Sequence, residues 1–171
     1  GDLAASEKHY EKAISIDDSK YTLWDQWLIN LWEIEEYEKM EEAAMNSIEL
    51  FPNQAGAFIY YSMAVFENNQ RELVEEYLDE ASLIAGNNPV HLSSINIFKT
   101  WMKKDDLAND MIASTLGKLD ERHILSPVLM EMTGDLYHSI SDPANTRKYW
   151  KKAINYGADR ERINRKIGML N

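Results

Sequence analysis

The sequence contains no cysteine, and its 171 residues include only seven glycines and four prolines. The lack of cysteine excludes disulfides, cysteine-ligated zinc, iron–sulfur clusters and thiol catalysis, and it leaves the redox compartment open. The scarcity of glycine and proline excludes long linkers and low-complexity tracts. The longest apolar run, residues 57–66, is too short to cross a bilayer, and no signal-peptide pattern opens the chain. We therefore expect a soluble protein, with the cytoplasm favoured over the periplasm.

The motifs that carry most enzyme chemistry are also missing. There is no glycine-rich phosphate loop, no dinucleotide-binding fingerprint and no nucleophile elbow. None of the histidines has the spacing of a zinc site. The four histidines are His9, His91, His123 and His138.

Three acidic groupings have structural interpretations. The pair Asp105-Asp106 is typical of a helix N-cap, where carboxylates oppose the helix dipole. The glutamates between positions 33 and 38 lack the spacing and central glycine of a calcium loop, which favours a solvated turn. Glu131, Asp135 and His138 share one helix face, and we favour an ordinary surface histidine over a functional trio. The sequence thus predicts a non-enzyme with no catalytic residue, cofactor or metal.

Charge is distributed unevenly along the chain. The formal net charge is −11, yet residues 145–171 carry +6, which leaves −17 for residues 1–144. A mostly acidic chain repels phosphate backbones, so we expect no nucleic-acid partner. The basic segment predicts a solvated outer face on two helices. The alternative is a docking patch for an acidic partner or for the acidic part of a second copy. Its basic residues are Arg147, Lys148, Lys151, Lys152, Arg160, Arg162, Arg165 and Lys166.

An internal repeat with a period of 34 residues runs through the chain. A shift of 34 places Trp24 on Phe58, Trp27 on Tyr61 and Leu31 on Val65. A shift of 72 continues the match, with Leu78 on Trp150 and Ala81 on Ala153. Because 72 is two periods plus four residues, one unit between residues 89 and 126 carries about one extra helical turn.

Each unit contains two stretches with the spacing of an amphipathic helix. Helix starts are marked by a capping residue before proline in Asn88-Pro89, Ser126-Pro127 and Asp142-Pro143. Gly86 and Gly157 stand where a helix ends in a left-handed conformation. No strand is predicted. The expected helices span 3–16, 21–34, 38–50, 55–67, 71–85, 90–104, 106–119, 127–139, 143–156 and 159–169.

A helix pair of this length and pattern resembles the tetratricopeptide repeat family, whose pattern is Trp-x2-Leu-Gly-x2-Tyr, then Ala-x3-Phe, Ala and Pro. The last copy matches best, through Met130, Gly134, Tyr137, Trp150 and Ala153. The glycine position of the first helix departs from the pattern elsewhere, since it holds Leu28, Ser62 and Asn96. A HAT-type helical repeat is the alternative, suggested by pairs such as Phe66-Glu67. The resemblance implies an all-α solenoid of antiparallel helix pairs, a right-handed superhelix of about nine or ten helices.

The repeat divides the chain, as one repeat domain, into six segments. Residues 1–18 match only the second helix of a unit, so we expect the chain to be a piece of a longer repeat protein. The last segment has one apolar stripe and a charged outer face, which suits a terminal cap helix. The segments are 1–18, the repeats 21–54 and 55–88, the degenerate repeat 89–126, the repeat 127–158 and the cap helix 159–171.

The resemblance also implies a binding groove, because in this family the first helix of each pair lines a concave wall that holds ligand peptides. By helical phase the wall is apolar with acidic edges and contains no lysine or arginine. The clamp of asparagine and basic residues that holds a C-terminal carboxylate in some relatives is absent. An apolar or basic peptide or helix is therefore the expected ligand. The expected groove residues are Asp25, Ile29, Trp32, Glu33, Ile59, Met63, Phe66, Glu67, Ile97, Trp101, Glu131, Asp135 and His138.

These observations predict a non-enzymatic scaffold for protein–protein interaction. Three alternatives stay open. The apolar wall and basic end could join copies of the chain into a homo-oligomer. The wall could be ordinary core. The chain could also be an accessory domain of a larger enzyme, and the sequence does not name the partner or the pathway.

Overall fold

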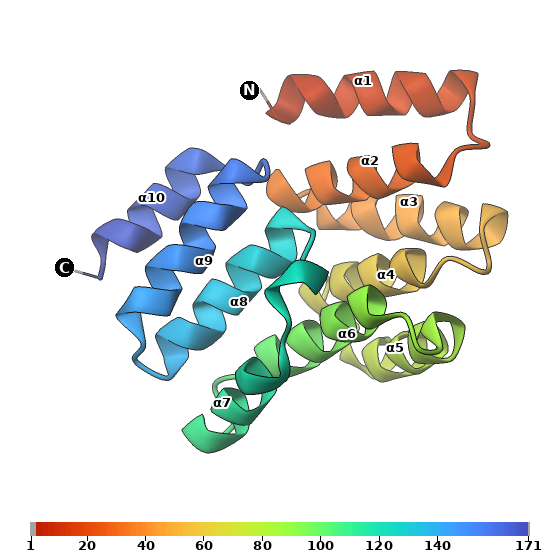
Figure 1. Cartoon of the computed structure of the whole chain (residues 1–171). Coiled ribbons are helices and arrows are strands. Elements are labelled where there is room, and N and C mark those ends of the chain that lie inside the picture. Colours follow the sequence, from red (N-terminus) through yellow and green to blue (C-terminus); the bar gives the residue numbers. More distant parts are fainter. Residues whose placement is uncertain (1–2, 171) are drawn as a thin grey trace. The chain divides into compact units, whose positions relative to one another are not determined.

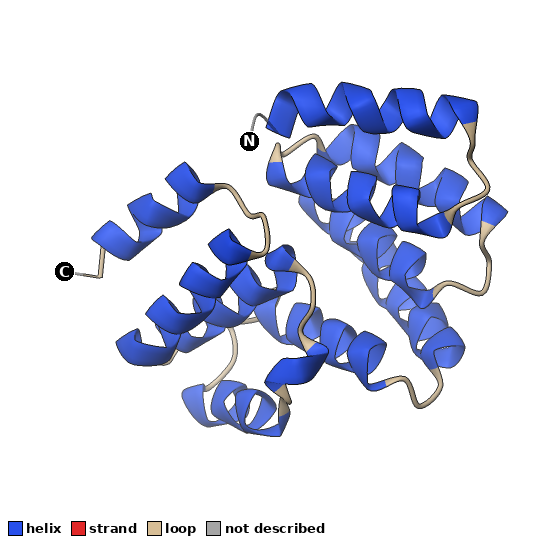
Figure 2. Cartoon of the chain, turned by 45° about the horizontal axis from the view of Figure 1, so that its top comes forward, coloured by secondary structure: helices blue, strands red, loops and turns tan. Residues whose placement is uncertain are grey.

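The computed structural model describes residues 3–170, and all regular elements in that range are helices (Figures 1 and 2). Residues 1, 2 and 171, at the ends of two predicted segments, lie outside this range. The all-α prediction is confirmed. The elements are α1 (Leu3–Ile16), α2 (Tyr21–Glu33), α3 (Tyr37–Leu50), α4 (Ala55–Glu67), α5 (Arg71–Ala85), α6 (Pro89–Trp101), α7 (Asn109–Lys118), the 3-10 turn η1 (Glu121–His123), α8 (Pro127–Ser139), α9 (Pro143–Asn155) and α10 (Arg160–Gly168).

Most predicted helix boundaries agree with the structure because their capping chemistry is local. The side-chain oxygens of Asn88 and Asp142 each accept a backbone N–H of the following helix at 3.0 Å. Ser126 occupies the N-cap position of α8 as predicted, but its side chain makes no cap hydrogen bond to that helix. Gly86 and Gly157 follow α5 and α9 with φ of 54° and 111°, a backbone region that favours glycine.

The predicted N-cap at Asp105-Asp106 is wrong. Helix α6 ends at Trp101, and the chain then makes consecutive tight turns, in which the Asp106 N–H bonds the Lys103 carbonyl at 3.0 Å. The Leu107 N–H, which a cap at Asp105 would have satisfied, bonds the Lys103 carbonyl instead at 3.1 Å, and both carboxylates are exposed. Helix α7 begins later, with Ala108 at its N-cap.

The chain forms two compact units, Gly1–His91 (unit 1) and Leu92–Asn171 (unit 2), and the division falls within α6. In unit 1 each of α1 to α4 packs against the next helix, and α2 also packs against α4. Contact between the first helices of successive pairs is what stacked repeats require, since neither pair buries its apolar face alone. In unit 2, α8 packs against both α7 and α9, and α10 packs against α9.

The glycine position of the repeat shows how residue size sets helix approach. Leu28 and Ser62 occupy it in unit 1 and are fully buried, and the Ser62 hydroxyl donates to the Phe58 carbonyl at 2.8 Å. In unit 2 a Cβ on Gly134 would overlap the Trp150 ring and lie 2.6 Å from its Nε1. Only glycine therefore admits the Trp150 indole against α8.

Candidate interaction surfaces

The groove residues expected in unit 1 lie on α2 and α4, which contact each other. Half of them are buried, and Met63 is fully enclosed. The partly exposed members are Asp25, Ile29, Phe66 and Glu67. The surface available to a ligand is therefore narrower than helical phase alone predicts, and it keeps both apolar and acidic side chains.

One end of this surface is formed by Asp25 and Tyr21. Burial raises the pKa of the Asp25 carboxyl above its ordinary value. Burial, and then the nearby Asp25, raises the pKa of the Tyr21 hydroxyl. That hydroxyl has no hydrogen-bond partner in the described part of the chain, and a Cβ on Gly56 would overlap it. Both groups are held in an environment that disfavours charge.

The other end is formed by Phe66 at the end of α4. The Arg71 guanidinium of α5 lies 4.9 Å from the centre of the Phe66 ring, close enough for a cation–π contact. Glu67 follows Phe66 directly and is partly exposed. An aromatic ring beside both an acid and a guanidinium can contact apolar and charged ligand groups together.

Three of the groove residues expected in unit 2, Trp101, Glu131 and Asp135, belong to a polar cluster with Trp150. We call this cluster of Trp101, Glu131, Asp135 and Trp150 the Asp135 site. The Asp135 carboxylate accepts the indole N–H of Trp150 at 2.9 Å and that of Trp101 at 3.1 Å. These donors come from α9 and α6, so two helices fix the orientation of one carboxylate on a third.

Two basic residues of α10 complete the cluster. The Lys166 ammonium lies 2.9 Å from Asp135 Oδ1 and 2.7 Å from Glu131 Oε1. The Arg162 Nη2 atom lies 2.5 Å from Glu131 Oε2. Burial alone lowers the pKa of Lys166, but the attraction of Asp135 and Glu131 outweighs it and raises that pKa. The ammonium also lies 5.6 Å from the centre of the Trp150 ring.

This arrangement corrects two interpretations of the sequence. The basic segment is not only a solvated outer face, since Arg162 and Lys166 turn toward α8. Glu131 and Asp135, on the expected wall, are paired with Arg162 and Lys166, although that wall was expected to lack basic residues. The missed signal is a matched spacing: residues 131 and 135 are four apart on α8, as residues 162 and 166 are on α10.

The trio of Glu131, Asp135 and His138 is not assembled as a catalytic group. Both carboxylates bind α10, whereas His138 is exposed and its ring lies 5.7 Å from that of Trp150. Ile97, the remaining groove residue expected in unit 2, is fully buried.

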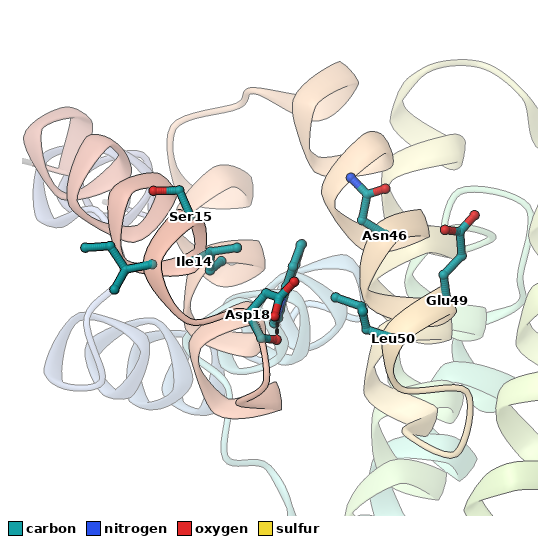
Figure 3. Close-up of a pocket in the computed structure, with 8 residues that line it drawn as sticks. Ile14, Ser15, Asp18, Asn46, Glu49 and Leu50 are labelled. Atoms are coloured by element: carbon teal, nitrogen blue, oxygen red, sulfur yellow. Dashed lines mark hydrogen bonds between the residues drawn. The ribbon is translucent and has the colours of Figure 1, made fainter.

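A pocket of about 470 Å³ in unit 1 was not anticipated from the sequence. Figure 3 shows Ile14, Ser15 and Asp18 on one side of it and Asn46, Glu49 and Leu50 of α3 on the other. Two apolar side chains at its edge are open to solvent: Ile16 is 76% exposed and Leu50 is 47% exposed. Helical periodicity does not flag this pocket, because its lining comes from helix ends rather than helix faces. It is lined by Ile14, Ser15, Ile16, Asp18, Trp24, Asn46, Glu49 and Leu50.

Within the described residues, no group of three histidine or acidic side chains could hold a metal ion. No helix described between residues 3 and 170 has the length and apolarity needed to cross a membrane. The features that a ligand could contact are apolar and aromatic side chains beside paired charges.

Comparison with known proteins supports the fold. No family model matches the sequence, and no curated protein matches it. The structure is similar to the crystal structure of a thermophilic TPR protein of Thermus thermophilus, with a TM-score of 0.58 and 12% sequence identity. The match covers 98% of this chain and 90% of the other. The chain thus has the fold of tetratricopeptide-repeat proteins, as its sequence pattern predicted.

Proposed function

We propose that the chain is a non-enzymatic scaffold that binds a protein segment on the inner faces of its repeat helices. The observation that carries the proposal is the tetratricopeptide-repeat fold itself, an arrangement that exposes extended helix faces to ligands. Fold alone does not name a ligand, so the site chemistry must supply its class.

The exposed part of unit 1 supports an apolar or basic ligand. Ile29 and Phe66 offer apolar area, and Asp25 and Glu67 lie beside them. Residues 1–144 carry a net charge of −17, which attracts cationic segments and raises their association rate. A peptide or helix with apolar anchors and basic flanks fits these features.

Affinity capture from host lysate, with bound proteins identified by mass spectrometry, tests this proposal. Three forms of the chain are compared: intact, Phe66→Asp, and Leu83→Asp as a matched control. Leu83 lies on α5 and is 76% exposed, so its replacement adds the same charge away from the inner faces. We expect a protein held by the intact chain and the control and lost by Phe66→Asp. Identical captures from three well-folded forms would contradict the assignment of the surface.

Self-association is a second candidate, favoured by the exposed Ile16 and Leu50 at the edge of the 470 Å³ pocket. Apolar side chains gathered around a hollow are typical of an interface. Light scattering across a concentration series tests it. A mass that rises with concentration, and falls back to that of a monomer in Leu50→Asp, would support association. A monomer at every concentration would exclude it.

A further inference from the structure

We propose that the Asp135 site recognises a basic helix with arginine and lysine one turn apart, and that α10 is its built-in occupant. A partner helix of this kind would bind by displacing α10. The inference rests on the proposed scaffold function and deepens it, because it names a partner class for one surface.

The site is organised independently of α10. The carboxylate of Asp135 is oriented by the indole donors of Trp101 and Trp150, which belong to α6 and α9. Neither donor belongs to α10. A carboxylate already held in position loses little freedom when it binds a cation, so the site is preorganised for an incoming ammonium.

The site also requires cations. Glu131 is only 6% exposed, and its two oxygens meet Arg162 and Lys166 separately. A carboxylate with so little access to water is unfavourable without a positive partner. Any helix that replaces α10 must therefore bring two cations that reach residues 131 and 135 together.

The geometry of α10 defines the ligand more closely. Arg162 meets Glu131, and Lys166 meets both Glu131 and Asp135, so α10 presents its cations in the same order as α8 presents its carboxylates. Ile163, next to Arg162, is fully buried. The matching pattern is Arg-Ile-x2-Lys on one helix face, with the ammonium against the Trp150 ring, 5.6 Å away in the occupied site.

Helix α10 is suited to be displaced. It has nine residues, fewer than an isolated helix needs to persist, and Ile163 is its one buried side chain in the described structure. The rest of its attachment includes ion pairs whose cations are partly exposed, so salt weakens them in part. An element with so little buried apolar surface opens more readily than a core helix.

The test uses the full chain and a fluorescent synthetic peptide with the sequence of residues 159–170. The peptide is titrated against the intact chain, against the double variant Arg162→Ala/Lys166→Ala, and against Ile163→Asp, with anisotropy as the readout. Each variant weakens the internal occupant by a different contact. We expect both variants to bind the peptide about tenfold or more tightly than the intact chain, in which α10 competes.

Two controls establish specificity. A peptide with alanine at both basic positions should not bind, and Asp135→Asn added to the double variant should remove binding of the original peptide. An unrelated helical peptide carrying Arg-Ile-x2-Lys should bind as the original does. Circular dichroism of each variant confirms that the remaining helices are folded.

Equal affinity for the intact chain and both variants, or binding that survives Asp135→Asn, would overturn the proposal. Binding of the native peptide but not of the unrelated one, with a dimer that forms through exchanged α10 helices, would overturn it in favour of a second copy as occupant. Loss of peptide binding while Phe66-dependent capture persists would refute this site alone. Peptide binding at the Asp135 site without any Phe66-dependent capture would refute the unit 1 surface and support this site.

Discussion

In unit 1 the helices α2 and α4 bury mostly apolar side chains, whereas in unit 2 the helices α8 and α10 meet through carboxylates and cations. Both units follow the same repeat pattern. The difference traces partly to one position, where unit 1 has Leu28 and Ser62 and unit 2 has Asn96 and, in its last repeat, Gly134. Glycine lets Trp150 approach α8 and bond Asp135, so a small residue opens the way for a polar cluster. Repeats that share a fold can thus carry different recognition chemistry.

The largest expected effect on this contrast comes from Trp150→Ala. The change empties a buried indole site and removes one donor to Asp135, so we expect the free energy of unfolding to fall by about 3–5 kcal/mol. Tyr156→Ala, at the exposed C-cap of the same helix, should change it by less than about 0.5 kcal/mol. Denaturant unfolding measures both. An unchanged midpoint for Trp150→Ala would show that the cluster does not hold unit 2 together.

A matched pair of substitutions tests the glycine position directly. Gly134→Ala forces a Cβ into the Trp150 ring, and we expect a loss of about 1–3 kcal/mol. Ser62→Ala at the equivalent position of unit 1 removes one hydroxyl bond and should cost about 1 kcal/mol or less. If Gly134→Ala proved no more costly than Ser62→Ala, residue size at this position would not explain the difference between the units.

Ionic strength should affect the stability of the two units differently. Salt at about 1 M shortens the screening length to roughly 3 Å, which weakens the ion pairs of α10 through their partly exposed cations and leaves apolar packing intact. We expect amide hydrogen exchange of α10 to accelerate about threefold to tenfold, while exchange of α4 stays unchanged or slows. Equal responses in α4 and α10 would mean that charge does not govern the attachment of α10.

The smallest effect at neutral pH is expected from Tyr61→Phe in unit 1. Burial, followed by the nearby Tyr77 and Glu41, raises the pKa of Tyr61 from 10.0 to about 12. Because the folded state holds this proton more tightly, the associated stability is present below pH 10 and is lost as pH rises toward about 12. Unfolding followed between these limits should show a weaker pH dependence in Tyr61→Phe. If the free energy of unfolding depended on pH equally in both forms, the loss of stability at high pH would have to come from other tyrosines.

Local chemistry explains what the sequence could predict. Helix spacing, the caps at Asn88 and Asp142 and the glycines after α5 and α9 depend on residues a few positions apart, and the structure confirms them. The cap predicted at Asp105-Asp106 was wrong because aspartate is common both in tight turns and at helix N-caps, and here the pair lies in the turns that follow α6. Repeat phase placed the buried Leu28 and Trp150 among the packing positions.

The pairing of α10 with α8 could not be derived in the same way. Arg162 and Glu131 are 31 residues apart, and their contact depends on which face of α10 turns inward. Helical phase likewise identifies a face and not its exposure. It placed Met63 and Phe66 together on the expected wall, and the structure encloses the first and leaves the second partly open. The groove assignment therefore stays a prediction that binding experiments must test.

The most direct test of the scaffold proposal is calorimetric titration of the captured protein, once purified, against the intact chain, Phe66→Asp and Leu83→Asp. The account predicts that Phe66→Asp weakens binding about tenfold or more and that Leu83→Asp binds as the intact chain does. Equal affinities for all three folded forms would contradict it.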